Sequence, residues 1–81
     1  MMLDVQLFAR ARDLAGTSCL RVSLPENATV ADLRRRLGEN VPSLGSLLAH
    51  CAIAVNNEWA ADATTLAPEA EVALLPPVSG G

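Results

Sequence analysis

Two short segments in the first third of the chain alternate apolar and polar side chains with a period of two. Residues 3–8 read LDVQLF and residues 19–24 read CLRVSL. This alternation is typical of β-strands that bury one face and expose the other. Asp13 and Gly16 lie in the connection, and Pro25 ends the second segment because proline cannot donate a ladder hydrogen bond. We expect these two strands to form a hairpin.

Helical segments are expected after this hairpin. Thr29 is followed by Asp32 three residues later, which resembles a capping box with a shorter acid. Apolar side chains then recur at helical spacing over residues 30–37, and Gly38 fits a helix terminator. A second, shorter helix that could cover the same core is expected over residues 42–48.

Two more strands complete the order of elements. Residues 51–55 read CAIAV, and the Asn56-Asn57 pair that follows tolerates the left-handed backbone of a turn. Residues 72–75 read VALL, with alternate side chains on opposite faces, and two prolines end this strand. The predicted fold class is therefore α+β, with a helix packed across one face of a mixed sheet.

The composition is that of one small globular domain. Hydrophobic residues make up 51% of the 81 residues and charged residues 19%, which is too apolar for a disordered chain. The longest apolar run, residues 72–78, is far shorter than the roughly 18 residues of a membrane span, and the start of the chain does not resemble a signal peptide. We expect a cytoplasmic protein. With a net charge of −3, no lysine and only two aromatic residues, a nucleic-acid partner is poorly supported.

No arrangement of side chains is typical of an independent enzyme. His50 has no evident partners for a catalytic triad, and Cys19 and Cys51 lack a further Cys or His at metal-ligand spacing. The arginine run at residues 34–36 is expected to form a solvated helix face, and no glycine-rich phosphate loop is present. We therefore expect no metal site and no cofactor bound by this chain itself.

The end of the chain, VALLPPVSGG, is the strongest functional signal. The rigid diproline is expected to project the tail from the sheet, and the residues after it are small. Six extended residues reach about 20 Å, enough to carry a terminal carboxylate into a narrow channel of another protein. A frayed end is the alternative interpretation. The residues expected to insert into a partner are Pro76, Pro77, Val78, Ser79, Gly80 and Gly81.

Strand parity predicts a docking surface near this tail. Phe8 shares a face with the polar residues of its strand, and Leu75 lies opposite the buried side of the last strand. Both large apolar side chains should therefore point away from the helix-covered core. With Trp59 as a further member, they are expected to form an exposed patch that docks partners. Single exposed hydrophobic residues without a function are the alternative.

The chain resembles the small, sulfur-carrying subunits of molybdopterin synthase, which are ubiquitin-like β-grasp proteins of molybdenum cofactor biosynthesis. The resemblance covers essentially the whole chain and rests on LFARARDLAG, AVNNEWA and VALLPPVSGG. Residues 67–71, APEAE, depart from the Gly-Asp turn that is common in the family before the last strand. The resemblance implies a β-grasp domain over residues 1–75, followed by a flexible Gly-Gly tail over residues 76–81.

The resemblance also implies how such a tail works. In the family, an adenylating partner similar to ubiquitin-activating enzymes uses ATP and magnesium to form a glycyl adenylate, which a sulfur donor converts to a thiocarboxylate. Gly81 would carry this sulfur into the large synthase subunit for the dithiolene of molybdopterin, made from cyclic pyranopterin monophosphate. Family complexes are heterotetramers of two large and two small subunits. The catalytic side chains are then expected on the large subunit.

Two alternatives remain open. Sulfur carriers for thiamine synthesis or tRNA thiolation share the fold, the Gly-Gly end and the adenylation step. The Pro-Pro-Val-Ser before Gly80 resembles the molybdopterin branch more closely. The other alternative is a non-catalytic ubiquitin-like interaction module, whose terminal glycines have no chemical role.

Overall fold

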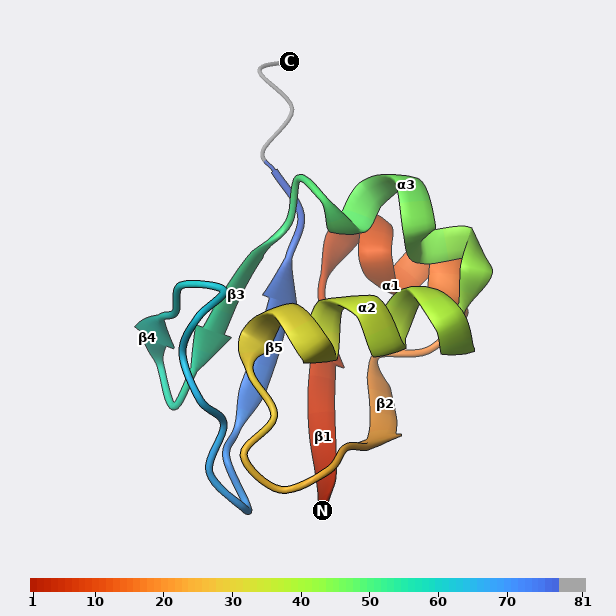
Figure 1. Ribbon diagram of the computed structural model, residues 1–81. Coiled ribbons are helices and arrows are strands. Elements are labelled where there is room, and N and C mark those ends of the chain that lie inside the picture. The colour runs from red at the N-terminus through yellow and green to blue at the C-terminus, as the bar shows by residue number, and fades with distance from the viewer. Residues whose placement is uncertain (78–81) are drawn as a thin grey trace.

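A mixed five-stranded sheet forms the centre of the molecule (Figure 1). The computed structural model describes residues 1–77. The strands are β1 (Met2–Leu7), β2 (Cys19–Ser23), β3 (Ala52–Val55), β4 (Glu58–Trp59) and β5 (Val72–Leu75). They lie in the order β2-β1-β5-β3-β4. β1 is antiparallel to β2 and parallel to β5, while β3 is antiparallel to both β4 and β5.

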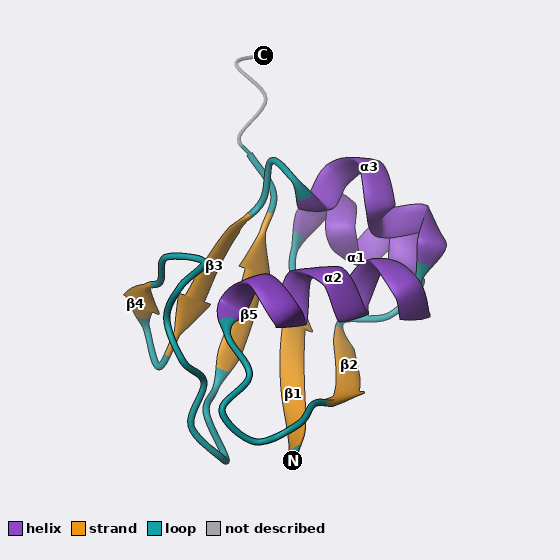
Figure 2. Ribbon diagram, viewed as in Figure 1, coloured by secondary structure: helices purple, strands orange, loops and turns teal. Residues whose placement is uncertain are grey.

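The helices cover one face of this sheet. They are α1 (Ala9–Ala15), α2 (Val30–Asn40), a 3-10 turn (Pro42–Leu44) and α3 (Gly45–Leu48). Figure 2 shows α2 crossing the face of the sheet, with α1 and α3 at the end toward which β1 and β5 run. The short helix expected over residues 42–48 is therefore present, as a 3-10 turn followed by α3. Across residues 1–77, no helix has the length and apolar character needed to cross a bilayer.

The core between α2 and the sheet is entirely apolar. Leu33 and Leu37 of α2 are fully buried, as are Val5 of β1 and Leu74 of β5. Among residues 1–77, no polar or charged residue is buried. The predicted α+β class, with a helix packed across one face of a mixed sheet, is confirmed.

The first two strands pair as expected, but they are not joined by a tight turn. β1 and β2 form an antiparallel ladder in which Leu3 faces Val22. The expected hairpin pairing is therefore confirmed, but the connection contains α1, whose Ala11 is fully buried and which was not predicted. Gly16 ends α1 with φ of 74°, a left-handed conformation that glycine adopts without steric penalty. Phe8, at the N-cap, makes no side-chain hydrogen bond and so leaves no helix-start signal in the sequence.

The capping box before α2 is confirmed. Thr29 Oγ1 accepts a hydrogen bond from Asp32 N (3.3 Å), and Asp32 Oδ2 accepts one from Thr29 N (2.9 Å). The bond from Thr29 N is the main reason that the pKa of Asp32 lies below its ordinary value. Gly38 does not end the helix, which continues to Asn40, so that prediction was wrong. A Cβ at Gly38 would lie 3.3 Å from Leu48 Cδ1, so the glycine allows α3 to pack closely on α2.

The turn predicted at Asn56-Asn57 is present and connects β3 to the short strand β4. Both asparagines have positive φ, 51° and 67°, which asparagine tolerates better than most residues. Asn56 N donates to Glu71 O (2.8 Å), and Asn56 Oδ1 accepts from Glu71 N (2.9 Å). The turn is thereby tied to the residue before β5. β4 itself was not predicted.

β1 and β5 lie side by side at the centre of the sheet and run in the same direction. Val5 pairs with Val72 and Leu7 with Leu74, and all four side chains are buried. β5 also pairs with β3, so it is hydrogen-bonded on both sides. Because parallel strands end at the same edge of a sheet, the end of β5 lies beside the end of β1. β5 ends at Leu75, as the prolines after it predict.

The turn before β5 contains a strained residue whose relief should stabilise the fold. Glu69 has φ of 65°, a left-handed conformation that costs a non-glycine residue about 1–2 kcal/mol. Glycine removes this cost, but its more flexible unfolded chain costs about 0.4–1 kcal/mol. We therefore expect Glu69→Gly to raise the free energy of unfolding by roughly 0.5–1 kcal/mol in urea denaturation.

Glu26→Gly is the matched control for this prediction. Glu26 is also exposed in a turn but keeps a negative φ, so glycine should lower stability there by up to about 1 kcal/mol. A loss of stability in Glu69→Gly equal to that in the control would contradict the strain at Glu69.

Candidate functional site

The candidate site is built around the edge of the sheet where β5 ends. Figure 1 places this edge at the end of the molecule opposite the N-terminus. Pro76, half-buried, and Pro77, exposed, continue the chain from Leu75 without pairing to a strand. Both prolines fix an extended backbone, so the chain leaves the sheet in a restricted direction. The other predicted tail residues, Val78, Ser79, Gly80 and Gly81, lie outside the described residues.

Phe8 and Leu75 each follow the last residue pair of the β1–β5 ladder at this edge. The parallel register pairs Leu7 with Leu74, so its next step brings Phe8 beside Leu75. Phe8 is 43% exposed and Leu75 is half-buried, whereas Leu7 and Leu74 are buried on the helix-covered side. Strand parity therefore predicted the orientation of Phe8 and Leu75 correctly. Their role in docking stays a prediction.

Trp59 lies on the same face of the sheet, but on β4, the outermost strand on the β3 side. It pairs with Ala54, which pairs with Ala73, and Ala73 pairs with Gln6 on β1. Trp59 is 72% exposed and is three strand positions from β1, about 14 Å at the usual strand spacing. In this register, Ala54 and Ala73 lie between Trp59 and the strand that leads to Phe8.

These residues define a continuous surface, which we call the outer apolar face. Ala54 and Ala73 lie between Trp59 and β1 in the ladder, and Ala52 lies on the same face as Leu75 because the two are register partners. The alanines were not predicted as part of the site, although the alternation in AIAV could have placed them on this face. The outer apolar face consists of Phe8, Ala52, Ala54, Trp59, Ala73 and Leu75.

A small hollow of about 240 Å³ adjoins the outer apolar face on the β1 side. It lies where β1, α1 and β2 meet, and it includes the exposed thiol of Cys19. Thr17 Oγ1 donates to Cys19 O (3.1 Å) and accepts from Cys19 N (3.4 Å), which fixes the backbone here. The hollow is lined by Gln6, Leu7, Phe8, Arg12, Ser18 and Cys19.

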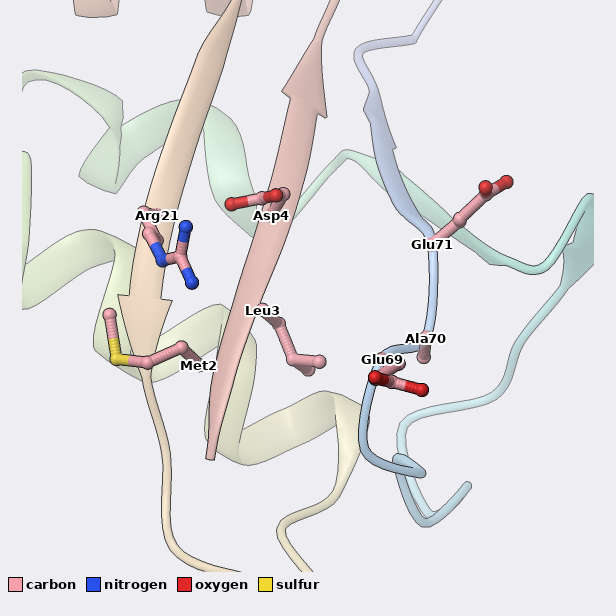
Figure 3. Close-up of a pocket in the computed structure, with 7 residues that line it drawn as sticks. All are labelled: Met2, Leu3, Asp4, Arg21, Glu69, Ala70 and Glu71. Atoms are coloured by element: carbon pink, nitrogen blue, oxygen red, sulfur yellow. The ribbon is translucent and has the colours of Figure 1, made fainter.

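A second hollow, of about 280 Å³, lies at the start of β1, at the opposite end of the sheet from the tail (Figure 3). Figure 3 shows Asp4 and Arg21 on neighbouring strands, where they are register partners. Its acidic residues are remote from Phe8 and Leu75, so we do not include it in the candidate site. It is lined by Met2, Leu3, Asp4, Arg21, Glu69, Ala70 and Glu71.

His50 and Cys51 are the titratable residues of the turn that precedes β3. His50 is exposed in the turn after α3, and no cluster of three or more metal-ligating side chains occurs in this part of the chain. Cys51 is buried, and desolvation raises the pKa of its thiol despite the neighbouring charge of Arg34. A raised pKa leaves Cys51 a poor nucleophile at neutral pH.

The arginine run on α2 is only partly the solvated face that was expected. Arg35 pairs with Asp32 (3.0 Å) and Arg36 with Glu39 (3.6 Å), both within the helix surface. Such exposed pairs contribute little to stability. Arg34 instead turns toward the protein, and its side chain is only 20% exposed. The prediction of a solvated face was therefore wrong for Arg34, because its partners come from segments distant in sequence.

Comparisons with known proteins agree with this geometry. Residues 5–81 match the ThiS family. A molybdopterin synthase sulfur carrier subunit of Arabidopsis thaliana is 34% identical over 79 residues, which cover 98% of this chain and 82% of that protein. Small archaeal modifier protein 1 of Haloferax volcanii is 36% identical over 87 residues, which cover 98% of this chain and 100% of that protein.

Solved structures are similar over the whole chain. The crystal structure of the Haloferax volcanii modifier superposes with a TM-score of 0.89 at 35% identity, covering 100% of both chains. A chain in the complex of subunits 1 and 2 of the Helicobacter pylori molybdopterin-converting factor superposes with a TM-score of 0.71 at 28% identity, also covering 100% of both. The expected ubiquitin-like β-grasp fold and the resemblance to sulfur-carrier subunits are confirmed.

The two cysteines should differ sharply in reactivity. Cys19 is exposed, whereas Cys51 is buried with a raised pKa, and only a thiolate reacts rapidly with iodoacetamide. Intact-mass measurement of the native protein should show one adduct, at Cys19, and a second only in denaturant. If Cys51 reacts only after global unfolding of about 5 kcal/mol or more, its rate should be at least roughly 1,000-fold lower. Equal rates would contradict the packing around Cys51.

Proposed function

The chain belongs to the ThiS family, and from this we propose that it is the sulfur carrier subunit of a molybdopterin synthase, with sulfur carried on the Gly81 carboxyl group. One observation carries the proposal most: a diproline follows β5 at the edge of the sheet where the exposed Phe8 and the half-buried Leu75 lie. A rigid exit for the tail and an apolar surface for partners thus lie at the same edge. The full-length similarity to sulfur carrier subunits supports it.

The chemistry requires activation by a partner. A C-terminal carboxylate is anionic at neutral pH and a poor electrophile. We propose that an adenylating enzyme, similar to ubiquitin-activating enzymes, binds ATP and magnesium and transfers AMP to the Gly81 carboxylate with release of pyrophosphate. The mixed anhydride provides a good leaving group, and the energy comes from ATP. In this scheme, this chain contributes the acyl group and the docking surface.

Sulfur then replaces AMP at the activated carbon. A sulfur donor at the oxidation level of sulfide attacks the carbonyl carbon of Gly81; the bond between that carbon and the AMP oxygen breaks as the carbon–sulfur bond forms. The products are a thiocarboxylate and AMP, and Gly81 itself undergoes no oxidation or reduction. Transfer in the large subunit would form a bond between this sulfur and a side-chain carbon of cyclic pyranopterin monophosphate, with an oxygen leaving group displaced there. Water would then hydrolyse the bond between the sulfur and the Gly81 carbonyl carbon, which returns the carboxylate for another cycle.

The length of the tail and the small size of its side chains suit delivery of sulfur into a channel of the partner. From Pro76, six extended residues span about 20 Å, so the Gly81 carboxyl group could enter a channel while the sheet stays outside it. Tail residues with small or absent side chains need little width. The outer apolar face would remain at the mouth of the channel, where Phe8 and Leu75 could contact the partner.

The outer apolar face is proposed to dock both the activating enzyme and the large subunit in turn. An exposed aromatic residue beside a partly buried leucine is typical of protein interfaces. The Helicobacter pylori structure, a complex of subunits 1 and 2 of a molybdopterin-converting factor, supports a large subunit as one partner. We propose a heterotetramer of two large and two small subunits, as the resemblance to molybdopterin synthase implies.

A second candidate function is protein modification. It is favoured by the similarity to small archaeal modifier protein 1. A modifier would use the same adenylate, but the amine of a target protein would displace AMP and form an amide with Gly81. A thiamine or tRNA sulfur carrier would follow the thiocarboxylate route and differ only in the acceptor. The product formed at Gly81 therefore separates modification from sulfur transfer.

One prediction of the proposed function concerns the chemistry at Gly81. Incubation with the cognate activating enzyme, ATP, magnesium and a sulfur donor should add the mass difference between sulfur and oxygen, located at Gly81 by fragmentation. A variant with one residue added after Gly81 should gain no mass there, because the acyl group is then displaced from the activating site. Equal sulfur incorporation in both proteins would contradict the terminal-carboxylate mechanism.

The second prediction tests the outer apolar face. Phe8→Asp places a charge on the proposed interface, so affinity for the large subunit should fall at least about tenfold in isothermal titration calorimetry. The fold should stay intact because Phe8 is 43% exposed. Met2→Asp is the matched control, since Met2 is 48% exposed on the same face of β1 but at the other end. Unchanged affinity for Phe8→Asp, or an equal loss for Met2→Asp, would remove this face from the proposal.

A further inference from the structure

Arg34 of α2 contacts residues from two segments that are distant from it in sequence. Its Nη1 donates to the carbonyl oxygen of Leu48 and to that of Cys51, the latter at 2.8 Å. Its Nη2 forms an ion pair with Asp62 Oδ1 at 3.0 Å. The guanidinium therefore joins α2 to the turn after α3 and to the loop between β4 and β5.

The contacts of Nη1 define the shape of one turn. Leu48 is the last residue of α3, and Cys51 directly precedes β3, so one nitrogen holds both ends of the turn over residues 48–51. Cys51 N also donates to Leu48 O (3.2 Å), which closes the turn. Charged donors bind carbonyl oxygens more strongly than neutral ones, so Arg34 is well suited to fix these carbonyls.

Fixing this turn is costly for Arg34. Its side chain is only 20% exposed, and its Nε is buried without a hydrogen-bond partner in the described structure. A buried donor without a partner lowers the stability of the folded state. α2 is already held by its capping box and by buried leucines, so the helix itself gives no reason for this arrangement.

The turn lies beside the base of the tail. Ala52, the first residue of β3, pairs with Leu75, the last residue of β5. Because these strands are antiparallel, the residues before Ala52 continue alongside those after Leu75, and Figure 1 shows the α3–β3 connection next to the end of β5. Ala49 and His50 are exposed in this turn. A partner that encloses the tail would therefore meet them.

We propose that Arg34 is a positioning residue, which holds the turn over residues 48–51 in one conformation. In this conformation the turn is a binding surface, called here the shoulder, which the activating enzyme contacts when it binds the tail. The inference rests on the proposed function. Without the guanidinium, the turn samples other shapes, and the partner binds only the fraction that keeps the native one. The apparent affinity then falls by that fraction, whereas the chemical step at Gly81, remote from Arg34 in the chain, is unaffected.

The test measures pyrophosphate release by the cognate activating enzyme at varied concentrations of the full-length carrier. Arg34→Met keeps the aliphatic stem but removes the donors. If one tenth of the molecules retain the native turn, its KM should rise about tenfold with kcat unchanged. Asp62→Asn is the matched control, since it removes the ion pair but leaves both carbonyl contacts, and its KM should stay within about twofold of wild type.

A second pair of variants tests the shoulder without touching Arg34, so that loss of folding in Arg34→Met cannot decide the outcome. Ala49→Arg adds bulk to the exposed turn and should also raise KM about tenfold, as expected for a clash at an interface. Ser46→Arg adds the same bulk on the exposed side of α3, away from the carbonyl contacts, and should change KM less than about twofold.

The outcomes separate this inference from the proposed function. Two results would overturn the role of the turn alone, provided that the wild-type protein is turned over. One is an unchanged KM in Ala49→Arg. The other is a fall in kcat, rather than a rise in KM, in folded Arg34→Met. If wild-type protein releases no pyrophosphate with any activating enzyme of this family, the proposed function fails, and the inference fails with it.

Discussion

The parallel pairing of the first and last strands is the constraint on which the rest of the structure depends. β1 and β5 are adjacent at the centre of the sheet, and their paired side chains are buried against α2. Parallel strands end at the same edge, so the pairing puts the exit of the chain beside Phe8. β3, on the other side of β5, brings the turn after α3 to that edge as well. The end of β1 and the turn after α3, which are distant in sequence, thus flank the base of the tail.

The residues that stabilise the fold are not those that the proposed chemistry uses. Every buried residue described is apolar, so the fold depends on packing rather than on buried charges. No acid, base or metal ligand set is needed inside the domain if the reactive atom is attached at the chain end. This division fits the proposed function, in which the chain contributes the acyl group and the docking surface.

Local signals in the sequence predicted the local features of this fold. The Thr29–Asp32 capping box, the Asn56-Asn57 turn and the alternation in VALL all involve neighbouring residues, and each is present. Strand parity also placed Phe8 and Leu75 correctly, because side-chain direction in a strand follows from sequence spacing alone. The resemblance at the chain end predicted the family.

Features that depend on distant contacts were missed. Gly38 resembles a terminator in the sequence, but its role is to make room for Leu48 of α3. Arg34 resembles its neighbours in the arginine run, yet its partners lie 14, 17 and 28 residues away. α1 has no capping side chain at its start, and at seven residues it is too short to be stable without tertiary contacts such as the burial of Ala11. Such tertiary effects carry no periodic signal.

The most direct test supplies the sulfur in advance. The protein would be prepared chemically with a thiocarboxylate at Gly81. It would then be mixed with the cognate large subunit and cyclic pyranopterin monophosphate, without ATP or activating enzyme. Sulfur delivery from the chain end predicts that molybdopterin forms in proportion to the thiocarboxylate added, with two carriers consumed for each product. Absence of molybdopterin from the thiocarboxylate, or equal yield from the unmodified carboxylate, would contradict it.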